Sequence, residues 1–538
     1  MSLALVLALV AGCGGGGSED EPDGESAVAE GEDAPDAGEE PDAAEAEWDE
    51  SAELVFYDSA PNHSMDPHDT VNDNNNAQAA PIAVYDRLID LDGGGQIVPG
   101  LAEEWGFTDD ELTEFELVLR GGVTFHDGEP LDAAAVVANL ERMIELSEAG
   151  EAGANVDAAA RRWASVEAVD DMRVRITLAE PHSSLPYDLS VQPGMMISPA
   201  AIAAEREGAE LEPIGAGPYK VVGLTPGSVV EMERFDDYWG GAEGRPATFE
   251  VHYVPEADTR LNAVRSGAAD VALIEARQAD EAEAGGLEVE RKDLVGIWFT
   301  MINSDGPLGD PAVRQAMMHA IDRQAIVDNV MFGEADVTEQ LFPPGYPYYN
   351  EDVAGSRDYD PELARELLAE AGYEDGLTLT HLLLNTPEYH RLSEAFSEMY
   401  AAVGITLDHT VGDVSQFASF GAGEFDLLTS RWGGRPDPLN NLGVTVTSGG
   451  RAYVPGGAVD PRLDELHEEA LGLQFGDSRH TEIILEMGAI ATEQAALLPI
   501  ATRRNLYAYQ PGCLDGPGDY PAQGSDDWRQ ARVPSSCS

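Results

Sequence analysis

Three segments in the second half of the sequence begin with an aspartate followed by a proline, and each pair precedes apolar residues at helical spacing. An aspartate accepts hydrogen bonds from the first free backbone N–H groups of a helix, and proline suits the first turn, which needs no N–H donor. The second segment places Leu363, Leu367 and Leu368 on one face. It ends at Gly372, and a strand pattern begins at Leu377, so helices and strands alternate as in an α/β fold. The three pairs are Asp310-Pro311, Asp360-Pro361 and Asp460-Pro461.

The first half of the chain is richer in strand-like patterns. The run Leu54-Val55-Phe56-Tyr57 predicts a buried strand, and apolar residues alternate with their neighbours in 115–119 and 174–178, as in half-buried strands. A helix is expected between these two segments, after Asp132. Since single cores stop growing near roughly 250–300 residues, a chain of 538 residues predicts two or three lobes.

The first 13 residues carry the pattern of an export signal. An apolar run from Leu3 to Val10 leads into Val10-Ala11-Gly12-Cys13, which resembles a bacterial lipoprotein cleavage box. We therefore predict a signal peptide over 1–13 and a lipid on Cys13 that anchors the protein on the outer face of the cytoplasmic membrane. Signal peptides begin with positive charge, and no Lys or Arg precedes the run, so we expect translation to start upstream of Met1.

The region that follows the lipid box is acidic and poor in large apolar residues. Residues 14–48 are mostly Gly, Ala, Pro, Asp and Glu, a composition that predicts a disordered tether. The whole chain has a formal net charge of −71, which repels nucleic acid and anionic lipid headgroups, so no nucleic-acid partner is expected. The acid excess suits cationic ligands or, as we favour, solubility in salty surroundings. Charge alone therefore names no substrate.

Two cysteines remain once Cys13 carries a lipid. In an exported protein these two, Cys513 and Cys537, are expected to form a disulfide that pins the C-terminal tail; the alternative is a pair of free thiols near the terminus.

Eight short motifs occur in order between about Glu53 and Tyr507, and each of them is weak on its own. They are Met65-Asp66-Pro67; Tyr85-Asp86 with Leu88; Pro99 to Trp105; Leu119 to Leu131, which includes the expected Asp127-Gly128 turn; Pro213 to Tyr219; Arg260 to Asp270; Asn303 with Val313 to Ala316 and Ala320 to Arg323; and Tyr359 to Tyr373. Together they resemble the bacterial extracellular solute-binding proteins of family 5, which serve importers of peptides, oligopeptides and nickel.

This resemblance implies a two-lobed α/β fold like that of the periplasmic binding proteins, of the large type II class with an extra subdomain. The ligand cleft would lie between the lobes, with hinge strands near 297–303 and 498–501. The expected first lobe covers 49–298, including the extra subdomain at about 91–181. The second lobe would cover 299–500, and 501–538 would return to the first lobe.

The resemblance also implies the function. The chain would be the substrate-binding component of an ABC importer, a monomer without a cofactor that closes on a peptide-like solute and delivers it to a permease driven by ATPase subunits. The alternatives are a ligand-sensing surface receptor, or a binder of a nickel chelate or sugar instead of a peptide. No Gly-x-Ser-x-Gly or His-Glu-x-x-His motif is present, and the turn around His126-Asp127 is interpreted as structural, so we do not expect an enzyme.

One glycine-rich stretch, Phe425 to Pro438, corresponds to the family loop that lines the ligand. Peptide-binding members usually carry an aspartate where Arg435 stands, which pairs with the α-amino group of the peptide. Arginine instead suits an anionic or blocked ligand end, unless it pairs with a surface acid. Trp432 can stack on a ligand, the alternative being a role in core or hinge packing. The predicted ligand contacts are Trp432, Arg435, Asn62, Met65 and Asn303.

The loop from Asn62 to His68 contains two histidines and Met65, which raises the possibility of a metal site. Nickel-type sites need three or more converging donors, and no cysteine is available here. We therefore expect solvated histidines and predict no metal.

Overall fold

The computed structural model describes residues 47–60, 63–69, 78–93, 95–413, 416–435, 437–450, 454–474, 476–518 and 526–537. The predicted signal peptide with Cys13, nearly all of the predicted tether, and Asn62 lie outside the described residues. Trp48, the last residue of the predicted tether, forms a β-bridge with Pro534. The regular structure therefore begins before Glu53, because a C-terminal segment far away in the sequence supplies the partner.

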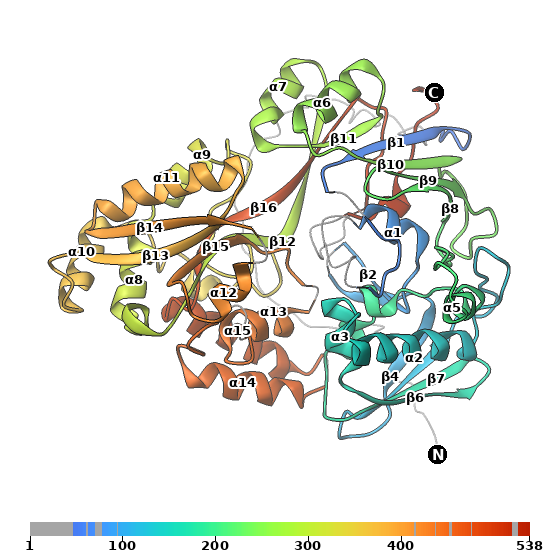
Figure 1. Cartoon of the computed structure of the whole chain (residues 1–538), viewed down its shortest axis with the longest axis horizontal. Helices are drawn as coiled ribbons and strands as arrows, with labels where there is room; N and C mark the ends of the chain where they lie inside the picture. Colours follow the sequence, from blue (N-terminus) through green and yellow to red (C-terminus); the bar gives the residue numbers. More distant parts are fainter. Residues whose placement is uncertain are drawn as a thin grey trace, which may run out of the picture. The chain divides into compact units, whose positions relative to one another are not determined.

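Ten strands of the described chain form one mixed sheet, which runs through both lobes (Figure 1). The two long strands β12 and β16 lie in its middle and pair with each other in antiparallel orientation. On one side β15 follows β12, and on the other β11 follows β16. In sheet order the strands are β14 (Ile405–Gly412), β13 (Leu377–Leu384), β15 (Leu427–Arg431), β12 (Glu288–Ile302), β16 (Leu498–Tyr509), β11 (Val271–Ile274), β1 (Glu53–Asp58), β10 (Thr248–Tyr253), β9 (Val229–Arg234) and β8 (Tyr219–Thr225).

The first lobe is the part built on β1, β8, β9, β10 and β11. It carries a second layer, the extra subdomain, in which helix α2 packs against a separate four-stranded antiparallel sheet. The side chain of Asp132 accepts a hydrogen bond from the N–H of Ala135, as the expected start of α2 requires. The elements are β2 (Ile89–Leu91), β3 (Ile97–Pro99), β4 (Ala102–Phe107), β5 (Glu114–Leu119), β6 (Trp163–Asp170), β7 (Arg173–Leu178), α1 (Ala79–Val84), α2 (Ala133–Ala149), α3 (Ala154–Ala160), α4 (Leu185–Asp188), α5 (Pro199–Arg206), α6 (Ala257–Ser266), α7 (Ala279–Ala284) and the 3-10 turns η2 (Gln192–Gly194) and η3 (Ala276–Gln278).

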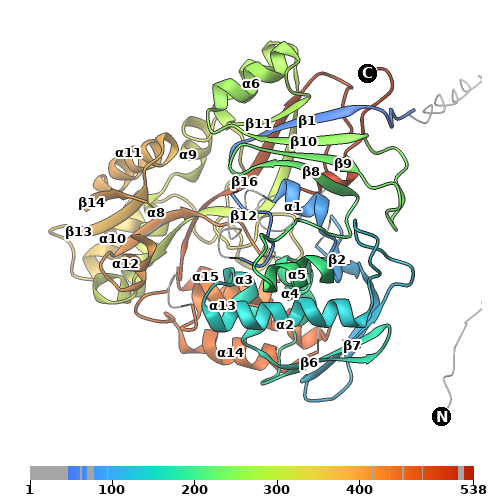
Figure 2. The ribbon, with the colours of Figure 1, turned by 45° about the vertical axis from the view of Figure 1, so that its right-hand side comes forward.

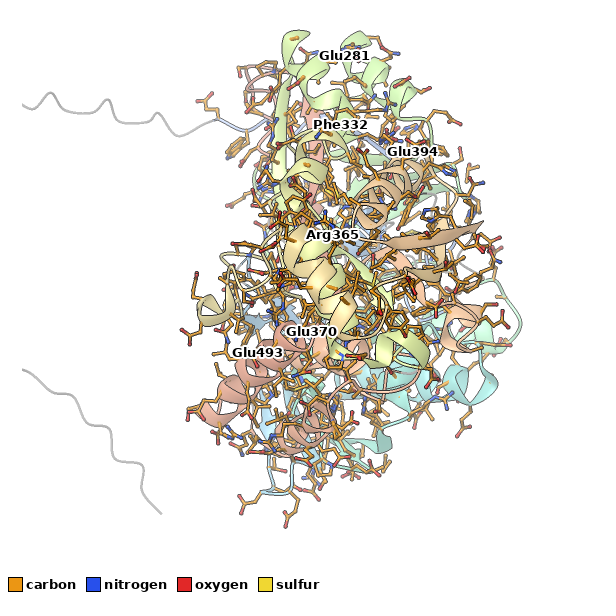
Figure 3. All side chains as sticks on the ribbon, turned by 90° about the vertical axis from the view of Figure 1, so that its left-hand side faces the viewer. Glu281, Phe332, Arg365, Glu370, Glu394 and Glu493 are labelled. Carbon is orange, nitrogen blue, oxygen red and sulfur yellow. A yellow bond between two sulfur atoms is a disulfide. The ribbon has the colours of Figure 1, made fainter. Side chains whose placement is uncertain are left out.

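The second lobe is the part built on β13, β14 and β15. All three predicted Asp-Pro helix starts are confirmed, because Asp310, Asp360 and Asp460 each accept a backbone hydrogen bond at the start of a helix. Charged side chains such as Arg365, Glu370 and Glu394 cover its outer helices (Figure 3). Its helices are α8 (Pro311–Ala320), α9 (Arg323–Asn329), α10 (Pro361–Glu370), α11 (Pro387–Ala401), α12 (Phe417–Gly421), α13 (Pro438–Val446), α14 (Pro461–Leu471), α15 (Ser478–Glu493) and the 3-10 turns η4 (Gly306–Gly309) and η5 (Glu351–Val353).

Separate hydrophobic cores support the two lobes. The first-lobe core contains Phe56 and Phe249, the subdomain core contains Phe115, and the second-lobe cores contain Phe299 and Phe396. In two views β12 and β16 pass between these parts (Figures 1 and 2). The predicted two-lobed α/β fold is confirmed, whereas the predicted residue limits of the lobes stay a prediction. No helix within the described ranges combines the length and apolar character needed to cross a bilayer.

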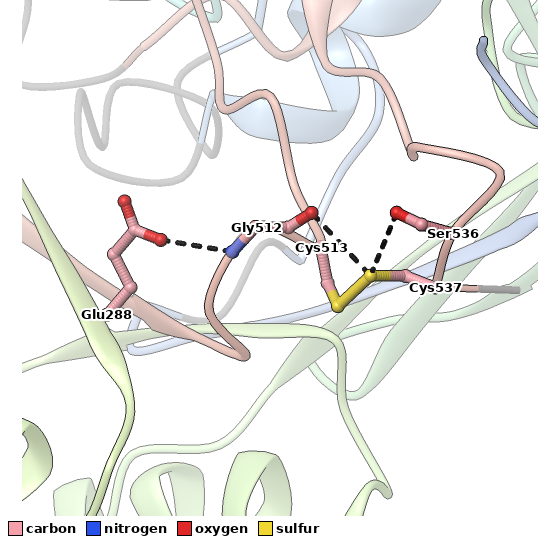
Figure 4. The surroundings of a disulfide bond; sticks show 5 residues. All are labelled: Glu288, Gly512, Cys513, Ser536 and Cys537. Atoms are coloured by element: carbon pink, nitrogen blue, oxygen red, sulfur yellow. Dashed lines mark hydrogen bonds between the residues drawn. A yellow bond between two sulfur atoms is a disulfide. The ribbon is translucent and has the colours of Figure 1, made fainter. Parts of the chain in front are cut away.

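The C-terminal tail returns to the first lobe. Trp528, in the 3-10 turn η7 (Trp528–Gln530), stacks on Phe56 with the ring centroids 4.2 Å apart. A disulfide joins Cys513 to Cys537, and the neighbouring N–H of Gly512 donates to Glu288 on β12 (Figure 4). The tail is thereby closed into a loop that carries a core tryptophan.

Replacing both cysteines by serine should lower the free energy of unfolding by about 3 kcal/mol, because a cross-link over 24 positions restricts the unfolded chain. Urea unfolding with and without a reductant provides the measurement. The reductant should bring the wild type to the level of the double variant and leave the variant unchanged. Equal stability of the two oxidised proteins would contradict the prediction.

Candidate functional site

A pocket of about 540 Å³ lies between the two lobes beside β16. The first lobe contributes Asp58 and Glu275, which lie at and just beyond the carboxyl ends of β1 and β11. The second lobe contributes Glu388 near the start of α11 and Arg431 at the end of β15, and residues 502–507 of β16 lie between the two walls. The carboxyl ends of neighbouring strands in an α/β sheet are where ligands usually bind.

Three arginines of the pocket wall act electrostatically on one carboxylate, that of Glu388. Nη1 of Arg431 lies 3.9 Å from Oε2 of Glu388, and Nη1 of Arg503 donates to the carbonyl oxygen of Trp432 at 3.1 Å. Burial raises the pKa of Glu388, against the opposing effects of Arg431, Arg503 and Arg391. Burial and the like charge of Arg431 lower the pKa of Arg503 to about 10. This wall is therefore rich in positive charge that a single carboxylate does not balance.

The first-lobe wall carries a buried acid. Asp58 is 3% exposed, and burial raises its pKa to about 7, although the N–H of Ser59 and the charge of Arg260 act in the other direction. Arg260 donates from Nε to the carbonyl oxygen of Leu273 at 2.6 Å and from Nη1 to that of Val254 at 2.8 Å. Its guanidinium is thus held by the backbone and positions the end of β11.

Trp432 faces the core of the second lobe. Its Nε1 donates to Oδ1 of Asn441 at 2.8 Å, and its ring lies edge-on to Phe299 at 6.4 Å. Trp432 is not among the residues that line the pocket, so its side chain matches the packing alternative. The predicted stacking on a ligand has no support in this geometry.

Arg435 connects the two lobes. Its Nη1 donates to Oδ1 of Asn155 on α3 at 2.9 Å, and its guanidinium lies 5.8 Å from the ring of Trp432. Arg435 does not line the pocket either. Its position favours a contact that joins the lobes over a direct contact with a ligand in this pocket.

Two other predicted contacts lie away from the pocket. Met65 is 4% exposed and belongs to the first-lobe core. Asn303 follows Ile302, which pairs with Leu427, whereas Trp298 pairs with Arg431 at the pocket end of β15. Because β12 runs antiparallel to β15, Asn303 lies at the far end of the strand from the pocket. Met65 thus packs in the first-lobe core, whereas Oδ1 of Asn303 accepts a hydrogen bond from the N–H of Asp305 at 3.0 Å. Asn62 lies outside the described residues.

The expectation of solvated histidines in the 62–68 loop is wrong for His68. Its side chain is fully buried, and Nε2 lies 2.9 Å from the carbonyl oxygen of Met195. Nδ1 faces Nη1 of Arg142 at 3.1 Å, and burial lowers the pKa of His68 to about 4. The described residues contain no group of three or more His, Cys, Asp or Glu side chains that could hold a metal.

The lobes also meet at a second seam, between the α4 region and the α13–α14 region. Ser183 donates from N and from Oγ to the carbonyl oxygens of Leu471 and Ala470 at the end of α14, at 3.3 and 3.2 Å. Nearby, Asp437 starts α13 by accepting from the N–H of Leu439, and it is 3% exposed. The hydrogen bonds of this seam join the two lobes, and the residues that form them do not line the pocket.

The carboxyl group of Asp437 is poorly compensated at this seam. Burial raises its pKa to about 6; Asp188 also raises it, whereas Ser184 and His182 lower it. Its Oδ2 has no hydrogen-bond partner among the described residues. The charge of Asp437 also contributes to raising the pKa of Tyr187, Tyr346 and Tyr348, after the larger effect of burial.

Known proteins resemble this chain in sequence. Residues 96–453 match the model of the bacterial extracellular solute-binding proteins, family 5. The glutathione-binding protein GsiB of Pectobacterium atrosepticum is 30% identical over 371 residues, which cover 66% of this chain and 68% of GsiB. GsiB of Salmonella paratyphi A is 32% identical, with 66% of this chain and 69% of that protein covered. The chain belongs to family 5. It is thus a substrate-binding component of an ABC importer, in a family of extracellular or periplasmic binding proteins and not of enzymes.

Solved structures agree with this membership. An ABC transporter substrate-binding protein from Sinorhizobium meliloti is 25% identical, with a TM-score of 0.73 and coverage of 90% of this chain and 100% of that one. NikA from Brucella suis in complex with Fe(III)-EDTA shares the fold at 22% identity, with a TM-score of 0.78 and coverage of 90% and 100%.

Sequence reasoning missed the residues of this family 5 protein that line the pocket. Arg391, Arg431 and Arg503 come from α11, β15 and β16, and no local pattern connects them. One signal was available, since Arg431 directly precedes Trp432 in the loop that the family resemblance had already marked.

The buried carboxyl group of Asp437 predicts a specific pH dependence. Its pKa is raised above the unfolded-state value, so the unfolded chain loses this proton at lower pH than the folded protein does. The group therefore lowers the free energy of unfolding as pH rises from about 4 to about 6, by up to about 3 kcal/mol. Asp437→Asn should gain stability relative to the wild type as pH rises through this range, measured by urea unfolding.

The matched control is Asp310→Asn, because Asp310 is an exposed cap that also accepts from the N–H two residues ahead. Its stability difference from the wild type should vary less between pH 4.5 and 7.5. If the free energies of unfolding of Asp437→Asn and the wild type changed in parallel with pH, Asp437 would ionise normally in the folded protein.

Proposed function

We propose that this protein captures a peptide-like small solute in the pocket between its lobes and closes around it before delivery to the permease. The observation that carries the proposal is the pocket itself, whose walls come from both lobes and from a strand that passes between them. Its volume of about 540 Å³ lies in the range of about 300–1,000 Å³ typical of small-molecule sites. A ligand that contacts both walls stabilises the closed arrangement.

The peptide-like class is supported by relatives and by chemistry. GsiB is named for binding glutathione, and a Helicobacter pylori relative of the same fold was solved with the peptide STSA. Arginines suit the carboxylate of a peptide, and the acids on the opposite wall suit an amine. A nickel chelate, a sugar and a ligand-sensing role remain the competing hypotheses.

We further propose how the remaining predicted features serve this function. Trp432 and Arg435 stabilise the closed lobes through packing and the contact with Asn155. The proposed lobe limits are 49–298, with the extra subdomain at 91–181, and 299–500, with 501–538 returning. They are supported by separate cores for the two lobes, although Trp298 and Ala501 belong to a second-lobe core. The protein works as a monomer with permease and ATPase subunits.

We also propose that a lipid on Cys13 holds the protein on the outer face of the cytoplasmic membrane, with 14–48 as the tether. This rests on the cleavage-box pattern before Cys13. Cys13→Ser, expressed in its host, should move from the membrane fraction to the soluble exported fraction. An unchanged distribution would refute the lipid anchor and leave the binding function unaffected.

A thermal-shift screen tests the binding function. Di- to octapeptides, glutathione, capped peptides, sugars and nickel chelates are offered to the purified protein in high salt. A ligand at a hundred times its dissociation constant adds about 2.7 kcal/mol of stability. At least one peptide-like compound should do so, and stabilisation by sugars or chelates alone would favour the competing hypotheses.

A variant that fills the pocket tests whether the ligand-induced thermal shift comes from binding at this pocket. Thr386 is exposed and lines the pocket at the start of α11, so Thr386→Trp should abolish the shift by occupying the ligand space. Thr225→Trp is the control, because Thr225 is exposed on β8 and does not line the pocket. A full shift with Thr386→Trp would place the ligand elsewhere.

A further inference from the structure

The turn after α9 contains a residue that its backbone conformation does not favour. The N–H of Glu334 donates to the carbonyl oxygen of Met331 at 3.0 Å, which closes a four-residue turn with Phe332 and Gly333 in its middle. Both middle residues have a positive φ, 57° for Phe332 and 77° for Gly333. Turns of this type are dominated by glycine, asparagine and aspartate, because a bulkier side chain crowds the backbone in this region. Phe332 therefore strains the folded protein.

Phe332 differs from the other strained residues of the protein. Among the described residues other than glycine, only Leu112 and Ala495 also have a positive φ. Leu112 is 1% exposed and Ala495 is fully buried, so the burial of each side chain offsets the strain of its backbone. Phe332 is 46% exposed. Packing in the interior therefore explains the first two positions and does not explain Phe332.

The residues around Phe332 hold the turn in place. Met331 and Ala335 are buried and belong to a second-lobe core. Glu334 accepts two hydrogen bonds from Arg291, at 2.8 and 2.7 Å. Both ends of the turn are thus fixed by contacts that do not involve the ring of Phe332. Strained residues that are held in place by their surroundings concentrate at active sites, ligand clamps and switch regions.

The exposed ring of Phe332 lies in the wall of the pocket. Of the large hydrophobic side chains that are exposed in the described part of the chain, only Phe332 lines the pocket. A single exposed hydrophobic residue is ordinary on a protein surface. An exposed ring on a strained turn in the wall of the pocket is not ordinary, and contact with a solute explains all three features.

Arg391 on α11 supports this ring. The guanidinium carbon of Arg391 lies 5.7 Å from the ring centroid of Phe332, which is labelled in Figure 3. A cation at this distance is attracted to the face of an aromatic ring. The contact positions the ring and leaves nearly half of the side chain exposed. The pocket wall thereby gains a flat apolar surface, on which a second aromatic ring packs favourably with centroids about 4.5–7 Å apart.

We infer that Phe332 is a specificity-determining residue whose ring receives an aromatic side chain, so that this importer prefers peptide-like solutes with an aromatic residue. This rests on the proposed function, because it assumes that the solute occupies the pocket. Phe332 acts on a side chain of the solute and not on its charged ends. The solute class therefore differs from glutathione, for which the relative GsiB is named and which contains no aromatic ring.

The test compares four tripeptides with the same charged ends. Trialanine is titrated into the protein by calorimetry, beside the three peptides in which one alanine is replaced by phenylalanine. At least one phenylalanine peptide should bind about 10-fold more tightly than trialanine, because its ring leaves water and packs on Phe332. Equal affinity for all four would overturn the inference and leave solute binding intact. Binding of none of them would overturn the proposed function for tripeptides and the inference with it.

Three variants assign the preference to the ring. Phe332→Asn removes the ring and suits the turn, so it should bring the favoured peptide to within about 3-fold of the affinity for trialanine. Phe332→Tyr keeps the ring and should keep the preference. The control is Tyr359→Asn, because Tyr359 is 48% exposed and does not line the pocket. An undiminished preference in Phe332→Asn would overturn the inference.

A measurement without ligand separates a binding role of Phe332 from a structural one. Phe332→Asn relieves the strain of the turn, so it should unfold at a higher urea concentration than the wild type. Tyr359→Asn should not raise the urea midpoint, since no positive φ is relieved there. A ring that supports the fold predicts the opposite for Phe332→Asn, and an equal or lower urea midpoint would overturn the inference.

Discussion

The antiparallel pairing of β12 with β16 is the constraint on which the rest of the structure depends. Both strands belong to the sheet of each lobe, so the cores on either side are connected through their hydrogen bonds. The pairing shifts register between Leu294 and Ile297, where Gly296 lies against the carbonyl oxygen of Trp432. A Cβ at Gly296 would meet that oxygen at 2.1 Å, so only glycine allows this approach. The same contact brings the end of β15 next to Arg503 and thus sets the positive wall of the pocket.

The second constraint is the placement of the 30 basic side chains in a chain that has 101 acidic ones. Several arginines, such as Arg161, Arg173 and Arg206, pair with acids at the surface, where each pair contributes little to stability. Arg529 is different, because it is 9% exposed and binds Asp86, Asp90 and Asp527, which ties the C-terminal tail into the first lobe. Removing one partner from such a network leaves a buried charge, so its importance lies in holding the tail in place. At the pocket, by contrast, guanidinium groups outnumber carboxylates, so cations are available there for a group outside the chain.

Local chemistry explains which features could be predicted from the sequence. Asp-Pro helix starts and alternating strands act over a few residues, so the α/β fold and the helices that begin at Asp310, Asp360 and Asp460 are confirmed. The candidate site depends on the packing of distant segments, so the ligand contacts expected from the sequence stay predictions. Met65 and Asn303 lie in motifs that belong to the family fold; Met65 packs in the first-lobe core, and Asn303 accepts a hydrogen bond from the N–H of Asp305. Arg391, Arg431 and Arg503 escaped notice because they meet only after α11 and β15 come together with β16.

The two contacts between the lobes differ in chemistry, and this difference governs how closure responds to a ligand. At the seam of Ser183 and Asp437 the protein supplies both partners, so closure there gains hydrogen bonds but also buries a carboxylate that prefers water. At the pocket, Glu388 and Arg431 of the second lobe border the same space as Asp58 and Glu275 of the first lobe, so a ligand there contacts both lobes. A ligand shifts a conformational equilibrium only by its differential affinity for the two states. Because the seam supplies its own hydrogen-bond partners, contacts made in the pocket are where a ligand adds to the free energy of closure.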